Sequence, residues 1–264
     1  MATHPGPASL VNNAVYSELG ERWYRAADDP IALLRAESRL RNPWIARQIE
    51  SHLAAGPCRV LDVGCGGGFL SNHLGSLGHE VTGLDASADA LGVAALHDRS
   101  GSVRYQQGDA LHLPFPDGCF DVVCAMDFLE HVEDRDRAIA EAARVLAPSG
   151  LFFFHTFNRN FLSWLIVIKG VEWFVRNTPK NLHVLRLFSK PDEVRAACLD
   201  HGLTAPELRG VRPAFGSAFW RMLVTRSVPE DFRFVFTSST ALGYSGVARR
   251  PNRRELLSAP PSSL

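Results

Sequence analysis

A glycine-rich turn between two acidic residues carries the clearest chemical signal in this chain of 264 residues. Gly64, Gly66 and Gly68 follow a short apolar run that contains Asp62, and Asp85 ends the next such run. Glycines let a ligand approach the backbone closely, because no Cβ stands in the way. A carboxylate at the position of Asp85 can accept hydrogen bonds from both hydroxyls of a ribose. The pattern therefore predicts a cofactor that contains a nucleoside.

Two classes of cofactor are held in this way, and the spacing separates them. The dinucleotide fingerprint is GxGxxG, whose third glycine allows a helix to pack closely on a strand. Here the spacing is GxGxG, and Phe69 stands in place of that third glycine. Asp62 would repel a pyrophosphate, whereas it would attract the ammonium and sulfonium groups of S-adenosylmethionine. The combination favours S-adenosylmethionine over a dinucleotide, and over a tight turn without a ligand, since three glycines before a helix are costly.

A second group of reactive residues lies in the segment MDFLEHV, which begins at Met126. Asp127, Glu130 and His131 are spaced to share one face of a helical turn. Two carboxylates and an imidazole suit a hard divalent cation such as Mg²⁺. Acidic residues ahead of a helix also stabilise its N-terminus, so the residue types leave both interpretations open. Glu130 and His131 are thus candidate metal ligands and also candidate catalytic residues, with His131 as a general base near neutral pH.

Two other histidines are candidate bases. His155 ends an apolar run, and His183 lies in a later segment rich in apolar residues. For both, a structural hydrogen-bonding role is favoured over catalysis.

The hydropathy pattern indicates the elements that must position these side chains. Short apolar runs alternate with helical stretches, which predicts an α/β fold with a doubly wound, mostly parallel sheet and helices on both faces. Ligands bind such sheets at the carboxyl ends of the strands, where the strand order reverses. The predicted strands are 59–63, 80–84, 103–106, 121–125 and 151–155, and the predicted helices between them are 68–77, 88–97 and 135–146.

The flanking segments define the predicted domain organisation. A tail and helices occupy 1–54, with helical periodicity over 15–54, and the main domain occupies 55–248. An apolar insertion at 157–187 interrupts this domain after its fifth strand. A helix at 189–201 follows, and strands at 232–236 and 241–247 are expected to form an antiparallel edge. The polar, proline-rich tail 249–264 is expected to be flexible.

Composition excludes several classes of partner. The 28 basic residues balance 28 acidic ones, so no nucleic-acid partner is expected. The five cysteines have no CxxC spacing, which fits a reducing compartment. Neither a signal peptide nor a spanning segment is recognisable, so the expected location is cytoplasmic.

The insertion, however, resembles a helix that lies in a lipid headgroup layer. Trp164 and Trp173 accompany Lys169 and Arg176 around an apolar block. This composition predicts peripheral contact with anionic lipid at the inner face of a membrane. A core helix packed on the sheet edge is the alternative.

Residues 60–155 resemble the class I S-adenosylmethionine-dependent methyltransferases. The resemblance is carried by LDVGCGGG, which begins at Leu61, by GDALHLPF, which begins at Gly108, and by FDVVCAMDFLEHV, which begins at Phe120. It implies that Asp109 contacts the adenine amino group of the cofactor.

A more specific resemblance, to the UbiG-type ubiquinone O-methyltransferases, spans about 22–203. It is carried by asparagine-arginine-asparagine at 158–160, the Ser-Trp, Gly-x-Glu-Trp and Pro-Lys motifs of the insertion, His183, and the segments ERWY and RNPW. It implies O-methylation of a (poly)prenylated phenol or catechol, a lipid-quinone acceptor, in quinone biosynthesis. It also implies that Gly64, Asp85 and Met126 contact the cofactor, and that Asp127, Glu130 and His131 hold the metal.

One feature of this family is missing. The family's cofactor-binding arginine after its Asn-Pro is replaced by Trp44 and Ile45, which leaves Arg41 and Arg47 as candidate substitutes. Two other functions stay open from the residues: methylation of O, N or C on another small hydrophobic molecule, and cofactor binding without catalysis.

Overall fold

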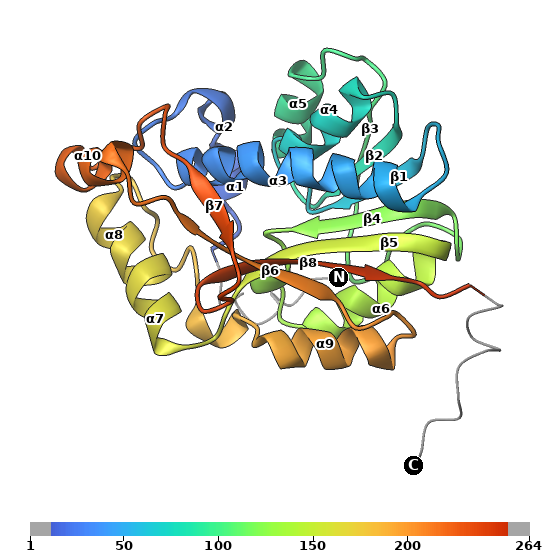
Figure 1. Ribbon diagram of the computed structural model, residues 1–264. Coiled ribbons are helices and arrows are strands. Elements are labelled where there is room, and N and C mark those ends of the chain that lie inside the picture. The colour runs from blue at the N-terminus through green and yellow to red at the C-terminus, as the bar shows by residue number, and fades with distance from the viewer. Residues whose placement is uncertain (1–11, 253–264) are drawn as a thin grey trace, which may run out of the picture.

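The computed structural model describes residues 12–252, which form an eight-stranded sheet with helices on both faces (Figure 1). The strand order is β3-β2-β1-β4-β5-β8-β6-β7. Strands β1 to β5 pair in parallel, whereas β8, β6 and β7 pair antiparallel and form one edge region. The strands are β1 Arg59–Val63, β2 Glu80–Asp85, β3 Arg104–Gln107, β4 Phe120–Met126, β5 Leu146–Phe157, β6 Glu207–Pro213, β7 Phe234–Thr237 and β8 Gly243–Arg249.

The sequence pattern predicts the parallel half of this sheet well and the antiparallel half partly. All five parallel strands are confirmed, and the order reverses between β1 and β4, which places the ligand-binding edge at their carboxyl ends. The antiparallel edge is also confirmed, but β6 was not predicted. Its sequence, ELRGVRP, lacks an apolar run, and it becomes a strand by pairing with β8 and β7.

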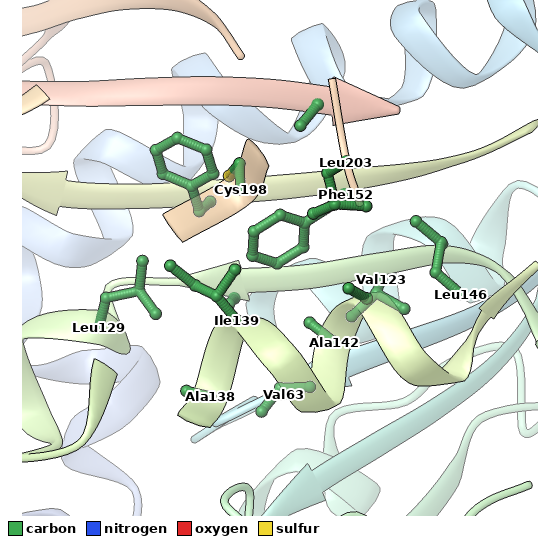
Figure 2. Packing of buried hydrophobic residues seen from close by; sticks show 14 of the residues in the cluster. Val63, Val123, Leu129, Ala138, Ile139, Ala142, Leu146, Phe152, Cys198 and Leu203 are labelled. Atoms are coloured by element: carbon green, nitrogen blue, oxygen red, sulfur yellow. The ribbon is translucent and has the colours of Figure 1, made fainter. Parts of the chain in front are cut away.

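Helices cover both faces because the central strands β4 and β5 bury consecutive residues, which point to opposite sides of the sheet. On one face, Ile139 of α6 packs with Cys198 of α9 and with Phe152 of β5 (Figure 2). On the other face, Trp44 of α3 packs on Phe153, the next residue along β5. The helices on the sheet are α3 Ile31–His52, α4 Phe69–Ser76, α5 Ala88–Leu96, α6 Arg135–Val145 and α9 Pro191–Asp200.

The N-terminal region is divided more finely than predicted. The helical periodicity over 15–54 corresponds to three helices, α1 (Val15–Glu18), α2 (Arg22–Arg25) and α3. Gly20 interrupts the first two with a φ of 48°. Ala26 leaves α2 in an extended conformation, and Pro30 precedes the first turn of α3. Residues 1–11 of the predicted tail lie outside the described residues.

The insertion after β5 forms α7 (Phe161–Ser163), a π-helical segment (Trp164–Gly170), α8 (Val171–Phe174) and the short turn Leu185–Leu187. Helix α10 (Ser217–Thr225) contacts α8, and both lie beyond the carboxyl ends of the parallel strands (Figure 1). Among residues 12–252, no helix combines the length and apolar character needed to cross a membrane. Strand β8 extends into the tail predicted from residue 249, and residues 253–264 lie outside the described residues.

Candidate active site

A cavity of about 1510 Å³ opens at the carboxyl ends of the parallel strands. Gly64, Asp85 and Met126 line it from the sheet, and Leu165 of the insertion and Phe219 of α10 line it from the opposite side. Pockets for a single small ligand usually measure about 300–1,000 Å³. The cavity can therefore hold two ligands side by side.

The glycine turn is fixed by backbone hydrogen bonds at the floor of this cavity. The N–H groups of Gly64 and Cys65 both donate to the carbonyl of Leu84, over 2.8 and 3.1 Å. Gly64 and Gly66 have φ values of 67° and 50°, which non-glycine residues rarely adopt. A Cβ on Gly66 would lie 2.5 Å from the ring of Trp23. The packing of α2 thus requires glycine at position 66, and the same glycine leaves the backbone open to the cavity.

Asp85 is held in one orientation by two backbone hydrogen bonds. One carboxylate oxygen accepts the N–H of Gly66 at 2.8 Å, and the other accepts the N–H of Ser87 at 2.9 Å. Each oxygen keeps a lone pair for another donor. Asp85 can therefore receive hydroxyl groups without moving.

The buried carboxylate of Asp62 fits a cationic ligand. The Ser71 hydroxyl donates to it over 2.6 Å, but burial still raises the pKa of Asp62 to about 7, and the charge of Asp85 acts in the same direction. A cation in the cavity would favour the charged form. An ammonium or sulfonium group matches this site, whereas a phosphate does not.

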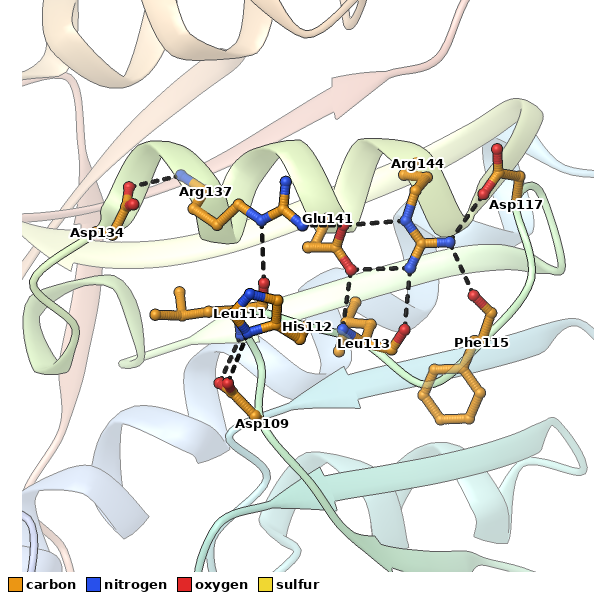
Figure 3. Close-up of polar contacts among 10 residues, drawn as sticks. All are labelled: Asp109, Leu111, His112, Leu113, Phe115, Asp117, Asp134, Arg137, Glu141 and Arg144. Carbon is orange, nitrogen blue, oxygen red and sulfur yellow. Dashed lines mark hydrogen bonds and ion pairs between the residues drawn. The ribbon is translucent and has the colours of Figure 1, made fainter. Parts of the chain in front are cut away.

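Asp109 follows β3 in a loop that α6 anchors (Figure 3). Glu141 accepts the N–H of Leu113 at 2.8 Å, and Arg144 donates to the carbonyl of Leu113 at 3.0 Å. Asp109 itself accepts the N–H of Leu111 and pairs with His112, both at 2.8 Å. Asp109 lines the cavity, where a cofactor could reach it. Its contact with adenine stays a prediction.

Asp127 lies in a buried cluster separate from the other two predicted metal ligands. It has a positive φ of 53° and forms a bidentate pair with Arg41. His155 lies 3.8 Å from Asp127 and 3.4 Å from Glu37. Burial alone would raise the pKa of Asp127, but the charges of Arg41 and His155 and the hydrogen bonds from Arg41 together outweigh burial and lower that pKa. By contrast, burial raises the pKa of Glu37 to about 7.

Glu130 and His131 meet His183 instead. One ligand atom of each lies within 4.8 Å of the others. Glu130 is fully buried, neither of its oxygens has a hydrogen-bond partner, and burial together with the charge of Asp127 raises its pKa to about 8. Burial lowers the pKa of His131 to about 4 and that of His183 to about 3. Both imidazoles are therefore neutral at pH 7, with a lone pair to offer.

Three further residues contribute to this site, and only one of them carries a sequence signal. Arg41 lines the cavity as the partner of Asp127, whereas Arg47, the other candidate for the missing arginine, is exposed on α3. Asn13 and Tyr16 contact His131 from the N-terminal segment. The RNPW motif, which begins at Arg41, marks that residue in the sequence. No motif marks Asn13 or Tyr16.

Comparison with known proteins agrees with this geometry. The family model of the methyltransferase domain matches residues 61–154. The ubiquinone biosynthesis O-methyltransferase of Aromatoleum aromaticum is 38% identical over 214 residues, which cover 80% of this chain and 88% of that protein. The protein of the same name from Paraburkholderia phymatum is 37% identical and covers 74% of this chain and 84% of its own length.

Solved structures share the fold at lower identity. Magnesium protoporphyrin IX methyltransferase from Synechocystis PCC 6803, with bound SAH, is 17% identical with a TM-score of 0.61, covering 90% of this chain and 98% of its own. The [4+2]-cyclase SpnF is 20% identical with a TM-score of 0.59, and the match covers 95% of this chain and 100% of the SpnF chain. Since a cyclase shares this fold, the assignment to methyl transfer depends on the sequence relatives. The chain is an S-adenosylmethionine-dependent methyltransferase and belongs to the family of the ubiquinone biosynthesis O-methyltransferases.

Proposed function

We propose that this enzyme methylates a hydroxyl of a (poly)prenylated phenol or catechol in quinone biosynthesis. The observation that carries the proposal is the two-sided lining of the cavity. Asp85 and Glu130 line it at the carboxyl ends of the strands, whereas the apolar side chains of Leu165, Phe174 and Leu223 line it from the insertion and α10. A polar ring with an apolar tail matches such a cavity, and the names of the sequence relatives point to the same class of acceptor.

The residues of the chain have separate roles in this proposal. Asp85 binds the ribose, the glycine turn lies against the amino-acid part of the cofactor, and Asp62 faces its positive charge. The bound cofactor supplies the methyl group. The remaining task is to align the acceptor oxygen, exclude water and remove the phenolic proton, whose pKa is about 10 in water. His131, which is neutral and has a lone pair, is proposed to accept this proton, and Glu130 is proposed to take part in its transfer, because both line the cavity and lie together.

Acceptors with tails of increasing length test this function. We expect a methyl ether by mass spectrometry, and kcat/KM that rises as a prenyl tail is added to the catechol. Methylation at nitrogen or carbon, or equal activity on an unprenylated ring, would contradict the proposal and favour another small hydrophobic acceptor. Cofactor binding without turnover of any acceptor would favour a binding module.

We further propose that Glu130, His131 and His183 hold a divalent cation. An unpartnered buried carboxylate beside two neutral imidazoles supports this set, and Asp127 is paired with Arg41 instead. Two nitrogens and one oxygen suit Zn²⁺ or Fe²⁺ better than Mg²⁺, which prefers oxygen ligands. When bound, such an ion would lower the pKa of a coordinated hydroxyl.

Calorimetric titration of Zn²⁺ and Mg²⁺ tests the metal without an activity assay. We expect tighter binding of Zn²⁺, its loss in His183→Ala, and its retention in Asp127→Asn. The reverse result for the two variants would favour Asp127, Glu130 and His131 as the ligands. Full activity in chelator would leave Glu130 and His131 with roles in proton transfer only.

We also propose that the insertion contacts an anionic membrane surface. Phe161 and Trp173 are 71% and 54% exposed, whereas Leu165 and Phe174 of the same segment line the cavity. The segment thus has one apolar side toward the acceptor site and another toward solvent. Arg176 is exposed beside it and supplies positive charge.

Co-sedimentation with vesicles that contain anionic lipid tests this contact. We expect wild type to pellet and a Phe161→Glu, Trp173→Glu variant to remain in solution. Leu96→Glu is the matched control, since Leu96 is 80% exposed on α5, away from the insertion. If the double variant pellets as wild type does, the membrane contact does not involve this segment.

A further inference from the structure

The N-terminal segment that contains α1 crosses the mouth of the active site. At one end, the N–H of Asn12 donates to the carbonyl of Asn181 in the insertion over 3.1 Å. At the other end, the hydroxyls of Ser17 and Ser87 lie 2.8 Å apart, two residues beyond Asp85. Between these anchors, the segment reaches His131.

Asn13 contacts both the backbone and the ring of His131. Its amide nitrogen donates to the His131 carbonyl over 3.1 Å, and its amide oxygen lies 3.2 Å from Nδ1. Because the amide nitrogen is turned to the carbonyl, only the oxygen faces the ring. An amide oxygen is an acceptor, so Nδ1 must carry the proton of the neutral imidazole.

This arrangement leaves the lone pair of His131 on Nε2. The Tyr16 hydroxyl lies 3.4 Å from Nε2, and the two rings meet edge to face with centroids 5.5 Å apart. Tyr16 also stacks on Trp23, at a centroid distance of 5.8 Å, and Trp23 covers Gly66. Contacts therefore run from His131 to the glycine turn through two aromatic side chains.

We propose that Asn13 is a positioning residue that fixes His131 as the Nδ1–H tautomer, so that Nε2 carries the lone pair and faces the Tyr16 hydroxyl. The inference depends on the proposed function in one respect: either role given there to His131, metal ligand or base, needs an unprotonated nitrogen in a fixed orientation. The partner of the other ring nitrogen sets that orientation. The segment that leads into α1 is thereby part of the active site.

The tautomer is measured directly by ¹⁵N imidazole NMR of the full chain, with the His131 signals assigned through His131→Gln. In wild type we expect the proton on Nδ1. In Asn13→Leu we expect it to redistribute toward Nε2, and in Asn13→Asp, which keeps an acceptor of the same shape, we expect it on Nδ1 again. Asn13 is exposed, so these variants should fold, and thermal unfolding checks this.

Kinetics supply the second measurement. We expect kcat in Asn13→Leu to fall by about 10- to 100-fold, as for partners that orient a functional histidine, with S-adenosylmethionine affinity unchanged and partial recovery in Asn13→Asp. Asn12→Leu is the control, because Asn12 contacts Asn181 through its backbone. A proton on Nε2 in wild type, or an unaltered tautomer in Asn13→Leu, overturns the proposal. Since the tautomer is read without an acceptor, this failure is distinct from the absence of turnover with prenylated catechols.

Discussion

Arg41 of α3 and Asp127, the residue after β4, form a buried bidentate ion pair, with Arg41 Nη1 2.8 Å from Asp127 Oδ1. The pair connects a helix on one face of the sheet to the edge where the cofactor and acceptor must meet. It also accounts for the positive φ of Asp127, because a strained backbone persists only where surrounding contacts hold it.

Removing the arginine should be strongly destabilising. Arg41→Met leaves the Asp127 carboxylate buried without its partner, which costs about 3–5 kcal/mol of the free energy of unfolding. Arg47→Met on the same helix is the control, since Arg47 is exposed and its loss should change that free energy by about 0.5 kcal/mol or less. Urea unfolding measures both, and equal stabilities of the two variants would show that the pair is not required.

Removing the carboxylate of Asp85 should weaken cofactor binding. Asp85→Ala deletes a charged acceptor that contributes about 1.5–3 kcal/mol per hydrogen bond, so S-adenosylmethionine affinity should fall at least about tenfold by calorimetry. Asp89→Ala, an exposed acid in the first turn of α5, should bind as wild type does. Unchanged affinity in Asp85→Ala would mean that another residue holds the ribose.

Adding a single methyl group to the glycine turn should also be damaging. Gly66→Ala combines a φ of 50° with a Cβ placed 2.5 Å from the Trp23 ring, and should destabilise the protein by about 1–3 kcal/mol. The contrasting variant is Gly92→Ala in α5, where nothing lies within 4 Å of the new Cβ. It should stabilise the protein by up to about 1 kcal/mol, because alanine is the better helix former. Similar melting temperatures for both variants would contradict this account.

The buried Glu130 should make stability depend on pH. Its pKa is about 8 in the folded protein against an ordinary value of 4.5, so between these values the folded state binds a proton that the unfolded state does not. Stability from this group is therefore present below pH 4.5 and is lost as the pH rises through 8.

Glu130→Gln should remove this loss. Between pH 5 and 8, the free energy of unfolding of this variant should fall less steeply than that of wild type. The two slopes should differ by at most about 1.4 kcal/mol per pH unit. The buried histidines have lowered pKa values, so their contribution to stability rises with pH. This contribution is present in both proteins and cancels in the comparison. Glu133→Gln, at an exposed position, is the control. Parallel pH profiles for wild type and Glu130→Gln would show that Glu130 does not retain a proton in the folded state.

The sequence by itself determined the parts of this protein that depend on local pattern. The five parallel strands and the glycine turn followed from period, spacing and the conformational demands of glycine, which act within a few residues. Asp85 was located for the same reason, because an acid at the end of the second strand lies beside the turn in any doubly wound sheet.

Only the tertiary structure decided which charged and polar groups meet. The spacing within MDFLEHV predicted that Asp127, Glu130 and His131 share one site. Asp127 instead pairs with Arg41, 86 residues away in the sequence. His183 of the insertion lies beside Glu130 and His131. Local spacing tells which side chains can share a helical face, whereas the partner of a buried charge is set by which distant segments pack against it, since burial makes an unpaired charge costly.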